Sequence, residues 1–267
     1  MNKKFCAFIA IIIILACSCA AGAEGLKIGI LANPENGLSF NTKQYLESTW
    51  LWSLIGHGHG ENDEYILFDD LPSMITALES GKIDEADLPQ IVAEYVMSQN
   101  NNYKISCVMR SQPMNLVFGF MKDKNVILWQ NFNYALGLMS RNGTLQALRE
   151  KYLSNPGKNT PEEIKFDSFP NAEKIKIAVT GDIPPIDYTA PDGTPAGFNA
   201  ALLAEIGRLL KINIEIVNTN AGARIAVLTS GRADGVFWID SENKLTENIL
   251  ISDPYYTFNI FLQLRKK

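Results

Sequence analysis

Two short segments of the sequence carry residue types that could bind a polar ligand. The first is GDIPPIDY (residues 181–188), in which Asp182, Asp187 and Tyr188 follow an apolar stretch and two prolines stiffen the loop. A carboxylate placed here could accept a charge-assisted hydrogen bond from an ammonium group. The alternative is that Asp182 caps a turn and Asp187 is solvated. We take all three residues as candidates for ligand binding.

The second segment is FWIDSENK (residues 237–244), which combines an aromatic ring with polar groups. Trp238 could stack against an aliphatic or aromatic ligand, or it could equally be a core residue at the end of a strand. Asp240, Ser241 and Lys244 follow it and add a carboxylate, a hydroxyl and a cation. This segment therefore predicts a second group of ligand-binding candidates.

A third candidate segment, NPENGLSFNTKQ (residues 33–44), joins a predicted strand to a predicted helix. Backbone N–H groups at the start of a helix bind anions. Asn33 and Ser39 are therefore candidates for an anionic group of a ligand, although ordinary helix capping explains Ser39 nearly as well.

The GHGHG segment places His57 and His59 close to Glu61 and Asp63 in the sequence, and these four side chains could bind a metal ion. Glycine flanks both histidines, so we favour a surface loop. We expect no metal and no cofactor, since the sequence also lacks a Walker-type phosphate loop, a CxxC pair and a GxSxG motif.

An internal repeat organises the elements that must hold these residues. The segments ITALESGKID (Ile75–Asp84) and IAVLTSGRAD (Ile225–Asp234) share the pattern Ile-x-x-Leu-x-Ser-Gly-basic-x-Asp, 150 residues apart. The pattern predicts a helix with Ile and Leu on one face. Gly81 or Gly231 would stop the helix, and a basic residue would lie beside its C-terminus.

Each copy of the repeat lies in a similar run of elements. Apolar stretches predict strands over 26–31, 64–69, 175–180 and 213–218, and periodic stretches predict helices over 41–55 and 197–210. This alternation is typical of parallel sheets covered by helices, so we predict an α/β fold with two similar lobes. Ligands of such sheets bind beyond the carboxyl ends of the strands, which predicts a cleft between facing lobes.

The remaining segments connect the two halves. Residues 115–123 predict a strand, residues 127–153 predict two helices broken near Asn142-Gly143, and residues 155–163 form a polar linker. The chain ends on a segment after Pro254 that alternates like a strand.

Residues 1–23 have the basic start, short apolar run and small residues of a secretory signal, with cleavage after Ala23. A lipoprotein signal with an acylated Cys17 is the alternative, but Leu15 fits it poorly, so we favour a soluble exported protein in the periplasm or another extracytoplasmic space. The chain carries 24 basic against 29 acidic residues, which argues against nucleic acid as the main partner. Cys107 alone lies beyond the leader, so we expect no internal disulfide, and we expect a monomer.

Several motifs resemble the family 3 extracellular solute-binding proteins, the amino-acid receptors of ABC importers. The segment VTGDIPPIDYTAPDGTPAGFNAALLAEIGRLL resembles the first βα unit of the family, SGRADGVF its third strand and ISDPYY its Ser-Asp-Pro-Tyr-Tyr segment. NFNYALGLMSRNGTLQALREKYL resembles the family's closing helices. The resemblance implies a periplasmic-binding-protein fold of type II, with two lobes that are each a mixed sheet flanked by helices. It also implies an amino acid or derivative as ligand, an ABC permease as partner and no cofactor.

The resemblance also assigns roles to single residues, with two departures from the family pattern. The family carries an Arg after its third strand that clamps a ligand carboxylate. That Arg is missing here, which leaves Lys244 or Arg224 for the role, or a ligand that is not an ordinary α-amino acid. Ser241 falls near a hydroxyl position of the family. Asp87 is the nearest candidate for the family's ammonium-binding Asp, although its spacing differs and we favour a solvated acidic loop there.

The order of these segments differs from the order usual in the family, because the closing helices precede the first βα unit. We therefore predict a circular permutant. Its expected parts are a signal peptide (1–23), the equivalent of the family's second lobe (24–113), a crossing strand with the closing helices (114–154), a linker joining the old termini (155–173) and the equivalent of the first lobe (174–267). Closely spaced termini make such a rearrangement physically inexpensive.

Two other functions stay open at this point. Exported dehydratases of the cyclohexadienyl type use the same fold, with carboxylates of the cleft as acid and base. Ligand-sensing modules use it too. We favour solute capture for ABC import over both.

Overall fold

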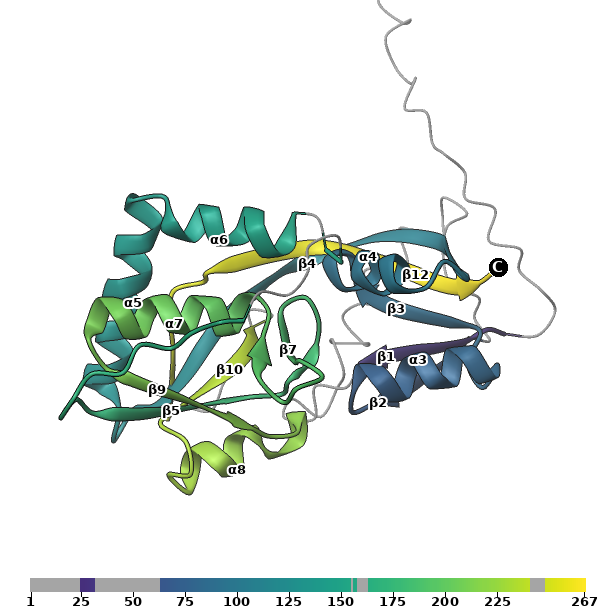
Figure 1. The fold of residues 1–267 in the computed structure, drawn as a ribbon. Coiled ribbons are helices and arrows are strands. Elements are labelled where there is room, and N and C mark those ends of the chain that lie inside the picture. The colour runs from purple at the N-terminus through teal and green to yellow at the C-terminus, as the bar shows by residue number, and fades with distance from the viewer. Residues whose placement is uncertain (1–24, 32–62, 155, 158–162, 241–247) are drawn as a thin grey trace, which may run out of the picture.

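The computed structural model of the protein describes residues 25–31, 63–154, 156–157, 163–240 and 248–267. These residues form a mixed α/β fold in which helices flank a large sheet (Figure 1). None of the helices in the described ranges is long and apolar enough to span a membrane.

The described residues of the first lobe form two parallel strand pairs and two helices (Figure 1). Its elements are β1 (Lys27–Leu31), β2 (Glu64–Phe68), α3 (Leu71–Ser80), β3 (Glu85–Pro89) and α4 (Gln90–Gln99). The central strand β1 pairs with β2 on one side and with β3 on the other. The apolar stretches predicted as strands over 26–31 and 64–69 are confirmed.

The second lobe holds most of the helices in the described ranges. Its elements are α5 (Val126–Arg141), α6 (Thr144–Leu153), β5 (Lys174–Val179), β6 (Asp182–Ile183), β7 (Asp187–Thr189), β8 (Pro195–Ala196), α7 (Phe198–Leu210), β9 (Asn213–Asn218), the 3-10 turn η3 (Ala221–Ala223), α8 (Arg224–Thr229), β10 (Gly235–Asp240) and β11 (Ile249–Ile251). The strands β6, β7 and β8 form a small separate sheet. The strands and the helix predicted within residues 175–218 are confirmed.

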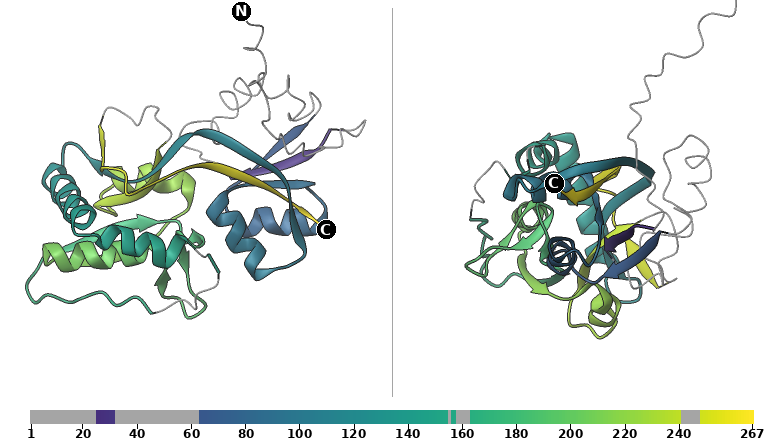
Figure 2. Two further views of the ribbon diagram at one scale, coloured as in Figure 1. Left: turned by 90° about the horizontal axis from the view of Figure 1, so that it is seen from above. Right: turned by 90° about the vertical axis from the view of Figure 1, so that its right-hand side faces the viewer.

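Two long strands run through both lobes and join their sheets into one. They are β4 (Tyr103–Met121) and β12 (Tyr256–Lys266), which lie side by side and antiparallel (Figure 2). The strand order is β2-β1-β3-β12-β4-β10-β5-β9, so β12 and β4 occupy the middle of the sheet, and β11 adds a further pairing with β4. The sequence predicted a strand over residues 115–123, and the structure shows one continuous strand that begins at Tyr103 and ends at Met121.

The ladder between these two strands is irregular where the chain passes from one lobe to the other. Phe258 pairs with Met114, whereas Ile260 pairs with Arg110, so three residues of β4 lie opposite one residue of β12. Pro113 lies in this stretch and has no backbone N–H to donate. The lobes are thus joined by a part of the sheet with weakened pairing.

The internal repeat has the same structural role in both lobes. Gly81 and Gly231 adopt left-handed φ values of 73° and 72° and end α3 and α8. Asp84 then accepts a hydrogen bond from the Lys27 N–H at 2.8 Å, and Asp234 accepts one from the Lys176 N–H, also at 2.8 Å. The predicted helix stop is confirmed, and the aspartate ties each helix end to the first strand of its lobe.

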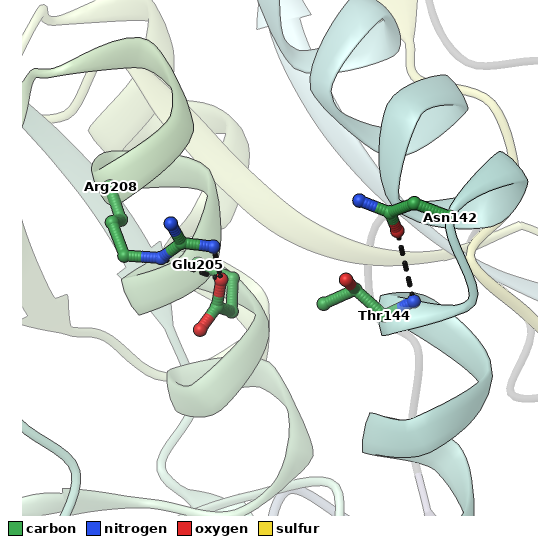
Figure 3. A network of polar contacts seen from close by, with 4 residues as sticks. All are labelled: Asn142, Thr144, Glu205 and Arg208. Carbon is green, nitrogen blue, oxygen red and sulfur yellow. Dashed lines mark hydrogen bonds and ion pairs between the residues drawn. The ribbon is translucent and has the colours of Figure 1, made fainter.

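The break between the two closing helices falls where the sequence predicted it. Gly143 has a φ of 82°, and the Thr144 N–H donates to Asn142 Oδ1 at 3.0 Å (Figure 3). The same view shows the neighbouring helix α7, on which Arg208 and Glu205 form an ion pair of 2.6 Å (Figure 3). Beneath α5, Phe132 packs edge-on against the ring of Phe118 in the core.

The chain end and the strand β1 lie at the same end of the sheet. Leu264 of β12 pairs with Ala86 of β3. The residue before it in β3, Glu85, pairs with Ile28 of β1. Since β3 separates β12 from β1, these two strands are about 10 Å apart. The Lys267 N–H donates to the Asn102 carbonyl at 2.9 Å and closes the β12–β4 ladder.

Candidate functional site

The loop after β5 is organised around a buried carboxylate. Asp187 is only 3 % exposed. Its Oδ2 accepts hydrogen bonds from the Thr180 N–H at 3.1 Å, the Thr180 hydroxyl at 3.4 Å and the Gly181 N–H at 3.2 Å. Burial raises the pKa of Asp187 to about 6, although the Gly181 N–H and the nearby Arg224 work in the opposite direction. The expectation that Asp187 might be solvated is wrong, because this side chain anchors the loop.

Asp182 lies at the start of the same hairpin, opposite Tyr188 in the β6–β7 pairing. Its Oδ1 is buried and has no hydrogen-bond partner among the described residues. Burial raises the pKa of Asp182, while the Thr180 hydroxyl and Arg224 lower it. Asp182 Oδ1 is thus a buried acceptor to which no group of the described residues donates.

Arg224 brings a positive charge to the two aspartates. It is the first residue of α8 and is 4 % exposed, and its guanidinium carbon lies 5.5 Å from the centroid of the Phe237 ring. Its charge favours ionisation of both Asp182 and Asp187. We call Asp182, Asp187 and Arg224 the Asp–Arg cluster.

Two residues beside this cluster were not singled out from the sequence. Tyr255 and Asn199 are both fully buried, and the Tyr255 hydroxyl donates to Asn199 Oδ1 at 3.0 Å. The negative charge of Asp187 helps to raise the pKa of Tyr255, after burial itself. The Asn199 amide Nδ2 has no partner in the described part of the chain. The signal was the polar residue inside GFNAALL, which breaks an otherwise apolar helix face.

A carboxylate of the first lobe also acts on Asp182. Asp70 caps α3, where its Oδ1 accepts from the Ser73 N–H at 2.7 Å, and its charge contributes to the raised pKa of Asp182. Asp70 and Asp182 are therefore like charges that approach each other from different lobes. The sequence offered no signal for this approach beyond a helix cap.

Tyr188 contacts the first lobe. Its ring centroid lies 6.2 Å from that of Tyr95 on α4, with the two planes at 44°. Burial raises the pKa of Tyr188, and the neighbouring Tyr95 and Tyr152 raise it further. Tyr188 was a candidate for ligand binding, and the structure places it at a contact between the lobes.

The acidic stretch after the first repeat is not a solvated loop, and that prediction was wrong. Asp87 lies in strand β3 and is 7 % exposed, and its Oδ1 has no partner among the described residues. Burial raises its pKa to about 8, with a smaller contribution from Glu85. Glu85 is also buried, with Arg265 Nη1 at 3.9 Å from its Oε1. The strand is covered on both faces, which local acidity does not reveal.

Several candidates lie outside the described residues or side chains. The candidates that lie outside the described residues altogether are Asn33, Ser39, His57, His59, Glu61, Ser241 and Lys244. Trp238 and Asp240 pair with β4 through their backbone in β10, and their side chains lie outside the description. Asp63, the remaining member of the histidine-containing segment, accepts a hydrogen bond from the Leu26 N–H at 2.7 Å. Within the described ranges, no group of His, Cys, Asp or Glu residues is arranged to hold a metal ion.

Charge balance and acceptor geometry define what the Asp–Arg cluster can do. Two carboxylates face one guanidinium, so the cluster keeps an excess of acceptor oxygens. A buried acceptor without a donor is costly, by roughly 1–3 kcal/mol. An ammonium, amide or hydroxyl group of a small molecule would supply the missing donor to Asp182.

Two α/β lobes joined by two crossing strands, with a buried charged cluster in one of them, thus define a two-lobed α/β protein. One protein-family model matches part of the chain. The model of the bacterial extracellular solute-binding proteins, family 3, matches residues 175–267, about a third of the chain. The matched stretch contains all three members of the Asp–Arg cluster. A search of curated proteins by sequence finds no significant match.

Solved structures show only a distant likeness. One is the ligand-binding component of an ABC-type import system from Staphylococcus aureus with zinc bound, with 15% identity, a TM-score of 0.46 and coverage of 91% of this chain and 66% of that one. Another is the periplasmic aliphatic sulphonate binding protein SsuA from Escherichia coli, with 14% identity, a TM-score of 0.42 and coverage of 92% and 66%. A third is CbnR, a LysR family transcriptional regulator, with 12% identity, a TM-score of 0.41 and coverage of 91% and 63%. The chain spans slightly less than two thirds of the length of each of these proteins.

Proposed function

We propose that the protein captures a small polar solute, an amino acid or a derivative of one, between its two lobes and delivers it to an ABC permease. The observation that carries this proposal is the buried Asp182 Oδ1, which lacks a donor among the described residues and lies beside a buried Arg224. The family match over residues 175–267, which contains this cluster, supports the same function.

The cluster suggests how such a solute would be oriented. Asp182 would accept from the ammonium group of the ligand, which supplies a donor that the described residues do not. Asp187 would hold the loop in place through its bonds to Thr180 and Gly181. For a ligand carboxylate, Arg224 and Lys244 both remain candidates. Arg224 already balances two aspartates, which favours Lys244.

Capture of this kind requires the lobes to open and close. The irregular pairing of β4 with β12 around Pro113 supports a hinge at this point, because few ladder bonds resist bending there. The like charges of Asp70 and Asp182 would favour the open form, and a cationic group between them would favour the closed one. Ligand binding would thus be coupled to closure.

We also propose that the chain is a circular permutant of a family 3 receptor. The motif order supports it, since the segments that resemble the closing helices, α5 and α6, precede the βα unit at β5. The shared end of the sheet at which β12 stops and β1 starts supports it as well. The domain limits given above and an exported location, soluble or anchored through Cys17, belong to the same proposal.

A thermal-shift screen tests the proposed capture. Amino acids, amines and small acids are added to the protein, and a bound solute raises the melting temperature by mass action. Asp182→Asn should abolish the shift of the best solute. Asp192→Asn is the matched control, because it removes the same formal charge from an exposed turn of the same hairpin region, where Asp192 binds Thr194. A shift that survives in the Asp182 variant would overturn the assigned role, and no shift with any solute would count against amino-acid-like ligands.

One observation also favours a second function. The pKa of Asp187 is raised to about 6 and that of Asp182 is raised too, and neighbouring carboxylates with raised pKa values can serve as acid and base. A dehydratase of the cyclohexadienyl type would convert prephenate or arogenate. Incubation with either compound, followed by detection of the aromatic product, would reveal turnover that Asp182→Asn removes.

A further inference from the structure

A second contact between the lobes lies away from the crossing strands. The turn at Pro156–Gly157 follows α6 of the second lobe and lies against the last turn of α4 in the first lobe. Gly157 has a φ of 79°, a conformation that L-residues rarely adopt. The turn therefore reaches from one lobe to the other.

The packing at this turn leaves no room for a side chain. A Cβ on Gly157 would lie 2.6 Å from Ser98 Cβ and 3.0 Å from Gln99 Nε2, and it would overlap Ser98 Oγ. Rotation of the Ser98 side chain relieves the clash with Oγ but not the clash with Cβ, because the backbone of α4 fixes that atom. The two lobes can thus pack together at this turn only because residue 157 is a glycine without a Cβ atom.

The aromatic contact described above continues the same surface. Tyr95 lies one turn before Ser98 on α4 and contacts Tyr188 of the second lobe, with 6.2 Å between ring centroids. The Ser98 hydroxyl donates to the Tyr95 carbonyl at 2.6 Å, which links the two parts within α4. Tyr152 of α6 is close enough to Tyr188 to raise its pKa. Contacts from α6 and β7 therefore converge on one end of α4.

We propose that Gly157 and Tyr188, seated on the last two turns of α4, form a clasp that holds the two lobes together and sets how often they separate. Gly157, the part of the clasp that the test alters, contacts Ser98 and Gln99 and lies outside the Asp–Arg cluster, so its substitution acts on the opening of the lobes. The clasp rests on the proposed opening, but its test needs no ligand. Failure of the clasp is thus distinguishable from failure of solute capture.

The test compares two glycine substitutions in the protein without added solute. Gly157→Ala introduces the clash with α4. Gly143→Ala is the matched control, since Gly143 has a φ of 82° but nothing within 4 Å of an added Cβ, and it lies within one lobe. Both variants carry the same backbone strain, so any difference between them comes from the interlobe clash.

Two measurements report on the clasp. In Gly157→Ala, amide hydrogen exchange in the last turn of α4 should be at least about tenfold faster than in Gly143→Ala. The radius of gyration from small-angle X-ray scattering should also be larger. Ser98→Gly in the Gly157→Ala background removes the clashing carbon and should restore the radius of gyration. It should also return exchange to the value of the Ser98→Gly single variant, which carries the same glycine in α4. Equal exchange in the two alanine variants, or no rescue by Ser98→Gly, would overturn the proposal.

Discussion

The most informative perturbation is Asp87→Asn, because it tests the burial of a carboxylate that the sequence suggested to be solvated. The pKa of Asp87 is raised from 3.8 to about 8 in the folded protein. Between these values the unfolded chain has released its proton while the folded protein still holds it. The folded state therefore binds more protons, and the free energy of unfolding falls as the pH rises, by about 1.4 kcal/mol per pH unit as an upper bound.

Asn carries no ionisable proton, so the variant escapes this loss. Its amide still lacks a partner, which costs roughly 1–3 kcal/mol at any pH. We therefore expect the stability difference, variant minus parent, to grow by about 2–4 kcal/mol between pH 5 and pH 8. Urea unfolding of both proteins at pH 5, 6, 7 and 8, without added solute, measures this difference.

Asp84→Asn provides the control, since it removes the same formal charge three residues earlier. Asp84 accepts a hydrogen bond from the Lys27 N–H at 2.8 Å, so its replacement should lower stability by about 1 kcal/mol. If the Asp87→Asn and parent curves run parallel across the pH range, Asp87 is not buried as a protonated acid and the reasoning fails.

Two further predictions concern the core and the repeat. Tyr255→Phe should lower the free energy of unfolding by about 1–2 kcal/mol, because Asn199 loses the hydroxyl that donates to it at 3.0 Å; an unchanged unfolding midpoint in urea would contradict this bond. Gly81→Ala should lower the free energy of unfolding by about 1 kcal/mol from left-handed strain alone, since nothing lies within 4 Å of the added Cβ. Gly29→Ala should lower it by more, because the added Cβ would lie 3.1 Å from Phe68 and closer still to Ile83. The same urea titration ranks the two, and the reverse order would refute the packing at Gly29.

Local patterns in the sequence were sufficient for much of the fold. Alternation of apolar residues located β5 and β9, and helical periodicity located α7. Glycine marked the ends of α3 and α8, and Asn142-Gly143 marked the break between α5 and α6. These features depend on neighbours within one or two turns of chain, which the sequence lays out directly.

The environment of the candidate site depends on contacts between segments that are far apart in the sequence. Whether a carboxylate is buried depends on segments far away in the chain, as for Asp87, opposite Gln263 of β12. The sequence showed Asp182 and Asp187 as a pair, but not that Asp187 is consumed in anchoring its loop while Asp182 keeps a buried acceptor. The roles of Tyr188 and Asn199 likewise depend on partners 93 and 56 positions away in the sequence.

The sequence by itself determined most of the elements in the described ranges, their order and the repeat that ties helices to strands, because these follow from periodicity, caps and turns. It missed strand β3 and the full length of β4. Only the tertiary structure decided that one sheet runs through both lobes along β4 and β12, and which acidic side chains lose their water. Strand register and desolvation are properties of contacts between distant segments. No local pattern of residues specifies them.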